Sequence, residues 1–376
     1  MSLQTMPAQP LSRSLVNRRF VIGGLAAVGG AAALAGVSNM SATDYDAILA
    51  DQLRPFATDF DVREMVRAAT LAANSHNTQP WRYRIGTDRI DIVPDFLRRT
   101  PVVDPDDHHL FASLGAATEN LTIAARHYGQ ATEIASPANA DGEIAIHLTG
   151  ATSEGSPLFD AITERQSSRS TYDASVVAND TLNNLASIAT TDGVDALVIT
   201  DTQRREDILE LVLAGNSAQL EDGVFRSELK SWLRFNPNAA ARSRDGLLSA
   251  ASGNPSLPDW LGPLMYDLTV KADGDNDKVA AQMRSSSGLV VFSAGRDDPA
   301  GWVAAGRAYE RFALAATRAG LQLAFVNQAV EVAAQRAQLQ SYLGLGTRRA
   351  DLIIRFGRGP TLARSLRRPV DDVLVS

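Results

Sequence analysis

The stretch "GRAYERFALAATRAG" (Gly306 to Gly320) repeats, without a gap, the pattern of "GAATENLTIAARHYG" (Gly115 to Gly129), which lies 191 residues earlier. Six of the fifteen aligned positions are identical. Both stretches are rich in small residues and end at glycine, which readily adopts the left-handed conformation that stops a helix. The pattern predicts two closely packed helices in a duplicated chain, although one such match could also arise by chance.

A second pair of segments supports the duplication. "DVREMVRAATLAA" begins at Asp61 and "DTLNNLASIATTD" at Asp180, and each aspartate is suited to cap a helix. Each half then continues through an expected strand (83–93; 196–200) to the glycine-bounded helix and a late strand (143–148; 351–356). This order predicts two α+β halves, residues 61–150 and 157–360, packed as a pseudo-dimer within one polypeptide.

The second half is expected to carry an insertion at about residues 221–283. The two segment pairs have different offsets, 191 and 119 residues, so the second half must contain extra chain. Its central part, from Arg234 to Asp267, contains four prolines among aromatic and leucine residues. Long segments of this kind are typically lids or disordered loops, and the aromatic residues favour a lid.

The overall composition excludes several classes of binding site and partner. With 45% hydrophobic residues, the chain can bury a large core. A formal net charge of −7 argues against nucleic-acid binding and confines any polyanion site to a local basic cluster. The absence of cysteine excludes disulfides, thiolate metal sites and iron–sulfur clusters.

The N-terminus has the features of a targeting segment. Basic residues, including Arg18 and Arg19, precede an apolar run at residues 20–37 that contains a small-x-small cleavage motif. We expect a signal peptide at residues 1–35 that resembles a twin-arginine (Tat) signal, a linker at 36–60, and an exported, periplasmic protein. The alternative is an uncleaved membrane anchor at residues 20–37.

Three polar clusters are candidate sites: "SHNTQPW" (75–81), "RQSSRSTYD" (165–173) and "LIIRFGRGP" (352–360). In the second, Arg165, Ser167 and Arg169 alternate, so an extended chain projects them from one face. The forked donors of an arginine guanidinium suit a phosphate, and Arg355 and Arg358 add two more arginines. A solvated turn with surface arginines is the alternative for either basic cluster alone.

Two other chemistries are not supported by the sequence. His108 and His109 follow acidic residues, but no further ligands are spaced for a metal, so we expect none. The serines near Arg165 lack a recognisable His/Asp partner pattern, which argues against a serine hydrolase.

The three clusters together resemble the flavin-dependent nitroreductase family, in which a homodimer binds FMN at its subunit interface. More closely, the chain looks like the Acg type, in which two nitroreductase-like halves and a lid share one polypeptide. The resemblance covers residues 61–360 and leaves 361–376 as a C-terminal tail. It implies an FMN site with no catalytic side chain, formed by Arg165, Ser167, Arg169, Ser75, His76, Asn77, Gln79, Asn327, Gln328, Arg355 and Arg358.

The resemblance also implies how that site is assembled. The first half keeps the polar loop and the second half keeps the basic motifs, so one complete FMN site per monomeric chain is expected. FMN would carry hydride from NADH or NADPH to a small-molecule acceptor, a nitroaromatic or a quinone, with Arg169 tuning the flavin. The alternative is an FMN-storage protein whose lid closes the substrate site.

Overall fold

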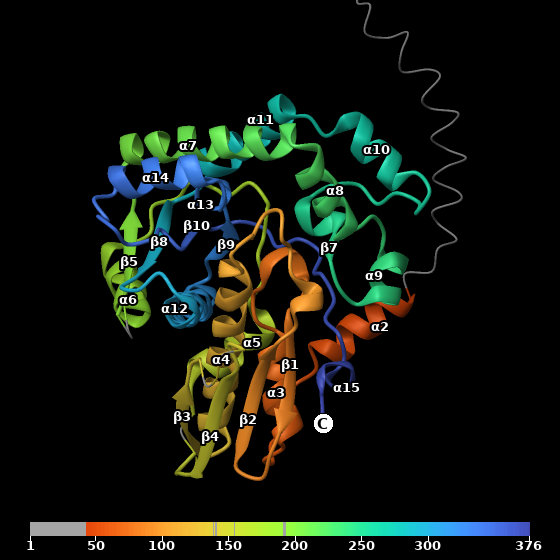
Figure 1. Cartoon of the computed structure of the whole chain (residues 1–376), viewed down its shortest axis with the longest axis vertical. Coiled ribbons are helices and arrows are strands. Elements are labelled where there is room, and N and C mark those ends of the chain that lie inside the picture. The colour runs from red at the N-terminus through yellow and green to blue at the C-terminus, as the bar shows by residue number, and fades with distance from the viewer. Residues whose placement is uncertain (1–42, 138, 140, 154, 191–192) are drawn as a thin grey trace, which may run out of the picture. The chain divides into compact units, whose positions relative to one another are not determined.

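The computed structural model describes residues 43–376 except 138, 140, 154 and 191–192. The predicted signal peptide and the alternative anchor lie outside these residues. Within them, no helix is both long and apolar enough to cross a membrane. The chain contains both helices and antiparallel sheets (Figure 1), which confirms the predicted α+β class.

The first half contains a four-stranded antiparallel sheet with strand order β1-β2-β4-β3. Trp81 and Tyr83 are fully buried against the helices on its inner face, whereas Arg82 and Arg84 lie on the outer face in ion pairs. The alternation is typical of a sheet covered on one side. The elements are α2 (Thr43–Gln52), α3 (Val62–Thr70), β1 (Trp81–Ile85), β2 (Arg89–Pro94), α4 (His108–His127), β3 (Gln130–Ala135) and β4 (Ile144–Gly150), with 3₁₀ turns at Ser75–Asn77 and Phe96–Arg98.

The second half contains a sheet with the same connectivity. Its strand order is β5-β8-β10-β9, which matches the first sheet when the four strands of each sheet are counted in chain order. In both halves a 20-residue helix, α4 or α12, connects the second strand of the sheet to the third. The elements are α5 (Pro157–Glu164), α6 (Asn179–Ala189), β5 (Val194–Ile199), β8 (Gly288–Ala294), α12 (Pro299–Arg318), β9 (Gln322–Phe325), α13 (Gln328–Glu331), α14 (Ala333–Tyr342) and β10 (Leu352–Gly357).

The second sheet is buried on both faces, unlike the first. Val290 and Phe292 of β8 pack toward α6 and α12, whereas Leu289 and Val291 pack toward α7 (Thr202–Glu221) and α11 (Ala272–Arg284). All seven residues of β8 are buried, which explains its continuous apolar sequence.

The segment between β5 and β8 forms both core helices and a lid. We define the lid as residues 222–271, which hold α8 (Gly223–Ser231), β6 (Leu233–Arg234), α9 (Pro237–Ser243), β7 (Leu247–Leu248), a 3₁₀ turn (Ser249–Ser252) and α10 (Gly262–Thr269). Residues 272–283, which we expected in the lid, instead form most of α11. Val279, Ala280 and Met283 pack into the core of the second half, so the apolar face of this helix overrides the loop-like composition before it.

The residues after β10 cross back to the first half as a strap, which we define as residues 358–376. The strap contains α15 (Val370–Val373), which contacts α3 and β1. Its Val375 N–H donates to the carbonyl of Tyr83 in β1 at 2.9 Å. The predicted C-terminal tail at 361–376 is therefore an integral part of the first half.

The helix ends agree only partly with the expected signals. Gly129 and Gly320 both have φ of +72°, which confirms the predicted left-handed ends. Asp61 caps α3 through a hydrogen bond from Arg63 N. Asp180 is not a cap: α6 begins one residue earlier, and Asp180 lies in its first turn.

The helices α4 and α12 cross in direct backbone contact at the two repeated glycines. A Cβ atom added to Gly115 would lie 2.1 Å from the carbonyl oxygen of Val303, and one added to Gly306 would lie 1.9 Å from that of Ala112. Neither position has room for a side chain, so the repeated glycines set the separation of the two halves.

We predict that Gly306→Ala destabilises the protein by about 1–3 kcal/mol, because its methyl group would force the two helix backbones apart. Urea unfolding followed by circular dichroism measures the effect. Gly274→Ala is the matched control, since that helical glycine has nothing within 4 Å of the added Cβ. Equal stability of the two variants would contradict the proposed close crossing.

Candidate functional site

Two adjoining cavities lie between the halves. Each has a volume of about 90 Å³, and both open to solvent. They share Ala73, Asn74, Arg169 and Phe325, so they form two arms of one cleft. Residues of both halves line each arm.

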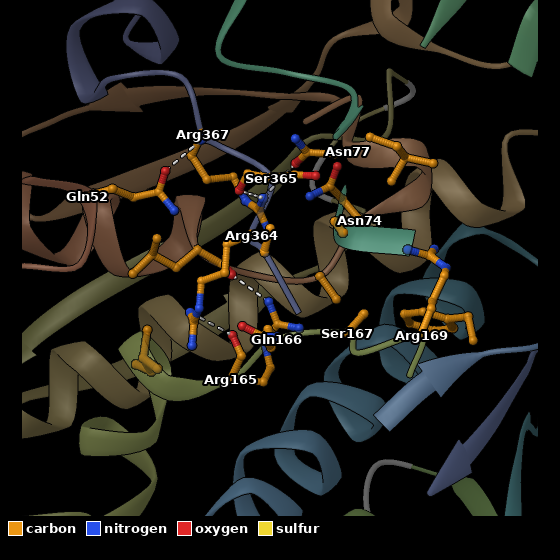
Figure 2. A pocket seen from close by; sticks show the side chains of 17 residues that line it. Gln52, Asn74, Asn77, Arg165, Gln166, Ser167, Arg169, Arg364, Ser365 and Arg367 are labelled. Carbon is orange, nitrogen blue, oxygen red and sulfur yellow. Dashed lines mark hydrogen bonds between the residues drawn. The ribbon is translucent and has the colours of Figure 1, made fainter. Parts of the chain in front are cut away.

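The first cavity is strongly basic. Arg165, Arg169, Arg364 and Arg367 line it, and its lining contains no aspartate or glutamate. Figure 2 shows Arg165, Arg364 and Arg367 gathered at one end, with Arg169 at the other. Serine and amide side chains complete its polar surface: Gln52, Asn74, Asn77, Gln166, Ser167 and Ser365.

Two of the three gathered arginines, Arg364 and Arg367, are held by carbonyl groups at the ends of helices. Arg364 donates to the carbonyls of Thr163 and Glu164 at the end of α5, and Arg367 donates to those of Thr70 and Ala72 at and just beyond the end of α3. These neutral acceptors fix the guanidinium groups and leave their charge uncompensated. Burial, with Arg165 and Arg364 nearby, accordingly lowers the pKa of Arg367 to about 9.

Arg165 is the exception within this group because it has a carboxylate partner. Its Nε lies 3.0 Å from Oε1 of Glu310, and its NH2 donates to the carbonyl of Leu71 at 2.8 Å. Since Glu310 belongs to α12 and Leu71 follows α3, Arg165 connects the two halves.

Arg169 stands where the two cavities meet. Among the described residues, no carboxylate lies within ion-pair distance of its guanidinium. Burial lowers the pKa of Arg169, and the nearby Tyr172 and Tyr309 hydroxyls oppose this. The alternating residues Arg165, Ser167 and Arg169 all line the first cavity, as the extended pattern predicted, whereas Ser168 and Ser170 turn away and donate to the Pro360 carbonyl.

The second cavity is walled by neutral and titratable groups. Ser75, His76, His109, Asn327 and Glu331 line it, together with Tyr309 and Arg169. His76 has φ of +46°, and its Nδ1 is buried without a hydrogen-bond partner. Strained backbone and unpaired polar atoms are concentrated at functional sites, so His76 is a candidate ligand-binding group.

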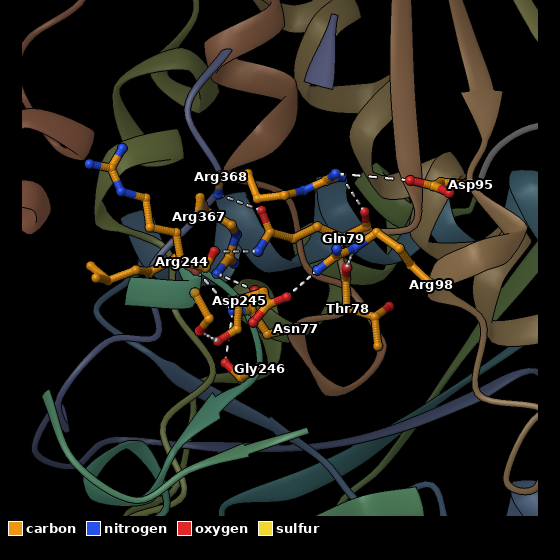
Figure 3. Close-up of polar contacts among 12 residues, drawn as sticks. Asn77, Thr78, Gln79, Asp95, Arg98, Arg244, Asp245, Gly246, Arg367 and Arg368 are labelled. Atoms are coloured by element: carbon orange, nitrogen blue, oxygen red, sulfur yellow. Dashed lines mark hydrogen bonds and ion pairs between the residues drawn. The ribbon is translucent and has the colours of Figure 1, made fainter. Parts of the chain in front are cut away.

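The polar loop "SHNTQPW" serves partly as a clamp (Figure 3). Asn77 donates to the carbonyls of Gly246 and Leu366, both at 2.8 Å, and accepts from Arg367 at 2.7 Å. Gln79 donates to the carbonyl of Arg244 at 2.9 Å and accepts from Arg368 N at 2.7 Å. Both amides thus tie the loop to the lid and to the strap.

The structure separates the predicted site residues into two groups. Seven line the cleft: Arg165, Ser167, Arg169, Ser75, His76, Asn77 and Asn327. Gln79, Gln328, Arg355 and Arg358 line neither cavity. Gln79 is bound within the clamp, and Gln328 faces Asn216 of α7.

The two C-terminal arginines need a specific correction. Arg355 is fully buried in β10, donates to the carbonyl of Ser170 at 2.8 Å, and places its guanidinium 4.1 Å from the ring centroid of Tyr172. Arg358 is exposed and donates to Ser175. The structure therefore gives Arg355 a role in fixing the 165–173 segment, and places neither arginine in the basic cavity.

Sequence reasoning missed three lining residues in the strap: Arg364, Ser365 and Arg367. The stretch "ARSLRRP" is a basic cluster, but no expected strand or helix adjoins it, so it resembled a solvated tail. Only the return of the strap to the first half brings it to the cleft.

Asp104, His108 and His109 form the one compact group among the described residues that could in principle hold a metal ion. Its ligand atoms already have protein partners. Asp104 accepts from the backbone N–H groups of His109 and Leu110, and the Nδ1 atoms of the two histidines lie 3.0 Å apart in a hydrogen bond. We therefore assign no metal to this group.

Comparison with known proteins gives a distant relationship. No protein-family model matches the chain. It is 24% identical over 322 residues to the "Putative NAD(P)H nitroreductase" of Mycobacterium tuberculosis, covering 81% of this chain and 87% of that protein. The similarity extends over most of both chains and supports a relationship to the nitroreductases.

Solved nitroreductase structures overlap with part of the chain. An FMN-dependent nitroreductase from Mycobacterium smegmatis in complex with NADPH gives a TM-score of 0.39 at 15% identity, covering 57% of this chain and 96% of that one. A nitroreductase with bound FMN from Bacteroides fragilis gives 0.36 at 14% identity, with the same two coverages.

We predict that Asn77→Ala destabilises the protein by about 1–3 kcal/mol, because it leaves two buried carbonyls without a donor and removes one acceptor of Arg367. Limited proteolysis should then cut the lid faster. Asn183→Ala, at an exposed position of α6, is the control. Unchanged lid protection in the Asn77 variant would contradict the clamp.

We also predict a pH effect from His76. Burial, helped by Arg169 and His109, lowers its pKa to about 4, so the folded protein holds it neutral. The unfolded chain takes up this proton near pH 6.5, and the stability that His76 contributes is lost as the pH falls from about 6.5 to about 4. Urea unfolding should show a weaker loss over this range for His76→Gln, whereas His147→Gln, exposed on β4, should behave as the wild type.

Proposed function

We propose that the protein is an FMN-dependent oxidoreductase of nitroreductase type that binds one FMN per chain in the composite cleft. The carrying observation is the first cavity, where four arginines meet no lining carboxylate. Glu310, outside this lining, pairs with Arg165. Arg364 and Arg367 are held by neutral carbonyls, so the cavity keeps an excess of positive charge that is suited to a phosphate dianion. The chain as a whole is acidic, so this charge is local.

The residues that line the cleft are chemically suited to the successive parts of FMN. Arg165, Arg364 and Arg367 would hold the phosphate, with the Ser167 and Ser365 hydroxyls as further donors. Arg169, at the junction, would face the pyrimidine side of the ring, and the second cavity would receive the ring and the acceptor. When bound, FMN supplies the hydride and electron transfer that no side chain here can perform.

The two halves would act as an intramolecular pseudo-dimer of the Acg type. Each sheet has the same strand order, and α4 and α12 cross at equivalent glycines. The first half gives the cleft its loop at 73–77, and the second half gives it residues 165–169 and Phe325. A site shared in this way needs no second chain.

The reaction would be hydride transfer from NADH or NADPH to a nitroaromatic or a quinone. The curated relative is named as an NAD(P)H nitroreductase, which supports this donor. The second cavity opens to solvent beside Arg169, which is where an aromatic acceptor would enter.

An FMN-storage role requires the lid to close the substrate side. The lid contributes Leu247 and Ala251 to the first cavity, but none of its residues lines the second. This arrangement covers the proposed phosphate end and leaves the proposed reaction end open. It favours turnover over storage.

Anaerobic stopped-flow mixing of the FMN-loaded protein with NADH and with NADPH tests the proposal. Rapid bleaching of the flavin by either donor, followed by reoxidation with a quinone, is the expected result. A flavin that dithionite reduces but neither nicotinamide does would instead support storage. A protein that remains colourless after incubation with FMN would reject both roles.

We predict that Arg169→Ala weakens FMN binding roughly tenfold to a hundredfold, because one charge-assisted hydrogen bond contributes about 1.5–3 kcal/mol. It should also lower the midpoint potential of bound FMN, since a positive charge near the ring stabilises the anionic reduced form. Fluorescence titration and spectroelectrochemistry measure the two effects. Arg358→Ala, outside the cleft, is the control and should leave both unchanged. Equal affinity of the two variants would remove Arg169 from the site.

A further inference from the structure

The second cavity has a pair of titratable groups in its wall that the proposed FMN site does not use. His109 lies on α4 of the first half, and Glu331 ends α13 of the second half. Nε2 of His109 is 3.7 Å from Oε1 of Glu331. Their side chains are 7% and 15% exposed, so a ligand in the cavity would meet both in a largely dry environment.

Neighbouring amides hold the pair in place. Gln219 of α7 donates to Oε2 of Glu331 at 2.7 Å. Asn327 lies 3.0 Å from Nε2 of His109, and its own oxygen accepts from Ile353 N at 2.8 Å. Because the Ile353 bond fixes the amide orientation, Asn327 presents an N–H to the His109 ring. The Oε1 of Glu331 is the oxygen left facing His109.

A hydrogen-bonded chain runs from the pair into the core. Nδ1 of His109 lies 3.0 Å from Nδ1 of His108, and Nε2 of His108 lies 2.9 Å from Oδ1 of Asp351. The other oxygen of Asp351 accepts from Ala294 N at 2.7 Å. The four titratable groups thus follow one another from the cavity to a carboxylate that is 0% exposed.

The surrounding charges favour retention of a proton. Burial raises the pKa of Glu331 and, to about 7, that of Asp351. Burial alone would lower the pKa of His109, but the Asp104 and Glu331 carboxylates reverse this and raise it, against an opposing effect of Arg349. His108 and His76 are held neutral by burial, and Arg169 is the remaining charged group lining this cavity.

We propose that Glu331, beside His109 at the wall of the second cavity, delivers its carboxyl proton to the oxygen of a quinone-type acceptor bound there. The proposal rests on the proposed function, which it deepens by naming the proton donor. Nε2 of His109 accepts from Asn327 and lies 3.7 Å from Oε1 of Glu331, so the transferable proton resides on Glu331, and His109 acts on it through charge.

The step balances for a quinone. Its reduction to the hydroquinone adds one hydride and one proton, and the hydride derives from the reduced nicotinamide of the proposed function. The O–H bond of Glu331 breaks as the O–H bond of the hydroquinone forms. Glu331 then regains a proton from solvent. Glu331 would touch the acceptor and is a catalytic residue in this sense, whereas His109 acts through Glu331 and is a positioning residue.

The test compares the wild type with Glu331→Gln and His109→Gln. Glu210→Gln, at an exposed position of the same helix that carries Gln219, is the control. FMN content is measured first. We then expect reoxidation of the dithionite-reduced protein by benzoquinone to slow about a hundredfold in Glu331→Gln, which is within the usual range for general acid catalysis, and less in His109→Gln. The wild-type rate should fall at alkaline pH as Glu331 loses its proton. This limb should be absent from Glu331→Gln and should shift in pH in His109→Gln.

Histidine NMR titration gives a readout that needs no turnover. The ring signal absent from His109→Gln identifies His109, whose pKa should lie above about 6.5 in the wild type and fall in Glu331→Gln. An unchanged His109 titration in Glu331→Gln would overturn the electrostatic coupling of Glu331 and His109. Normal FMN content with unchanged quinone rates would overturn the transfer step alone. A chain that takes up no FMN would reject the proposed function itself.

Discussion

The close crossing of α4 and α12, which Gly115 and Gly306 permit, is the constraint on which the rest of the structure depends. It brings the backbones of α4 and α12 together, and these two helices carry groups that define the cleft. His109 and Ser113 reach the second cavity from α4, and Tyr309 reaches it from α12. Glu310 on α12 fixes Arg165 in the first cavity. A small change in the separation of the helices would therefore displace both arms of the cleft together.

The electrostatics of the cleft follow from where its arginines find partners. Helix-end carbonyls are good acceptors but carry only partial charge, so they orient Arg364 and Arg367 without neutralising them. Carboxylates are instead concentrated around the second cavity and the core behind it. One arm is thus suited to an anion, while the other is suited to handling protons.

Local patterns in the sequence predicted the features that depend on a few adjacent residues. The duplicated helices, the alternation of Arg165, Ser167 and Arg169, and the cap at Asp61 all depend on spacing alone. Long-range contacts were not predictable in this way. Asn77 and Gln79 were correctly recognised as unusual, but their partners lie in the lid and strap. Arg355 was misplaced because the motif does not reveal which side of β10 it occupies. Arg364 and Arg367 lie in a basic cluster, but no expected strand or helix adjoins it to indicate a site.

The strap also imposes an order on the assembly of the cleft. During synthesis, Arg165 emerges almost 200 residues before Arg364 and Arg367, and the loop that begins at Ala73 emerges earlier still. The strap can bond to Tyr83 of the first half only after Val375 has left the ribosome. An anion-binding cavity built from such distant pieces forms only after Arg367 has been synthesised, so ligand loading cannot guide the folding of the residues that precede it.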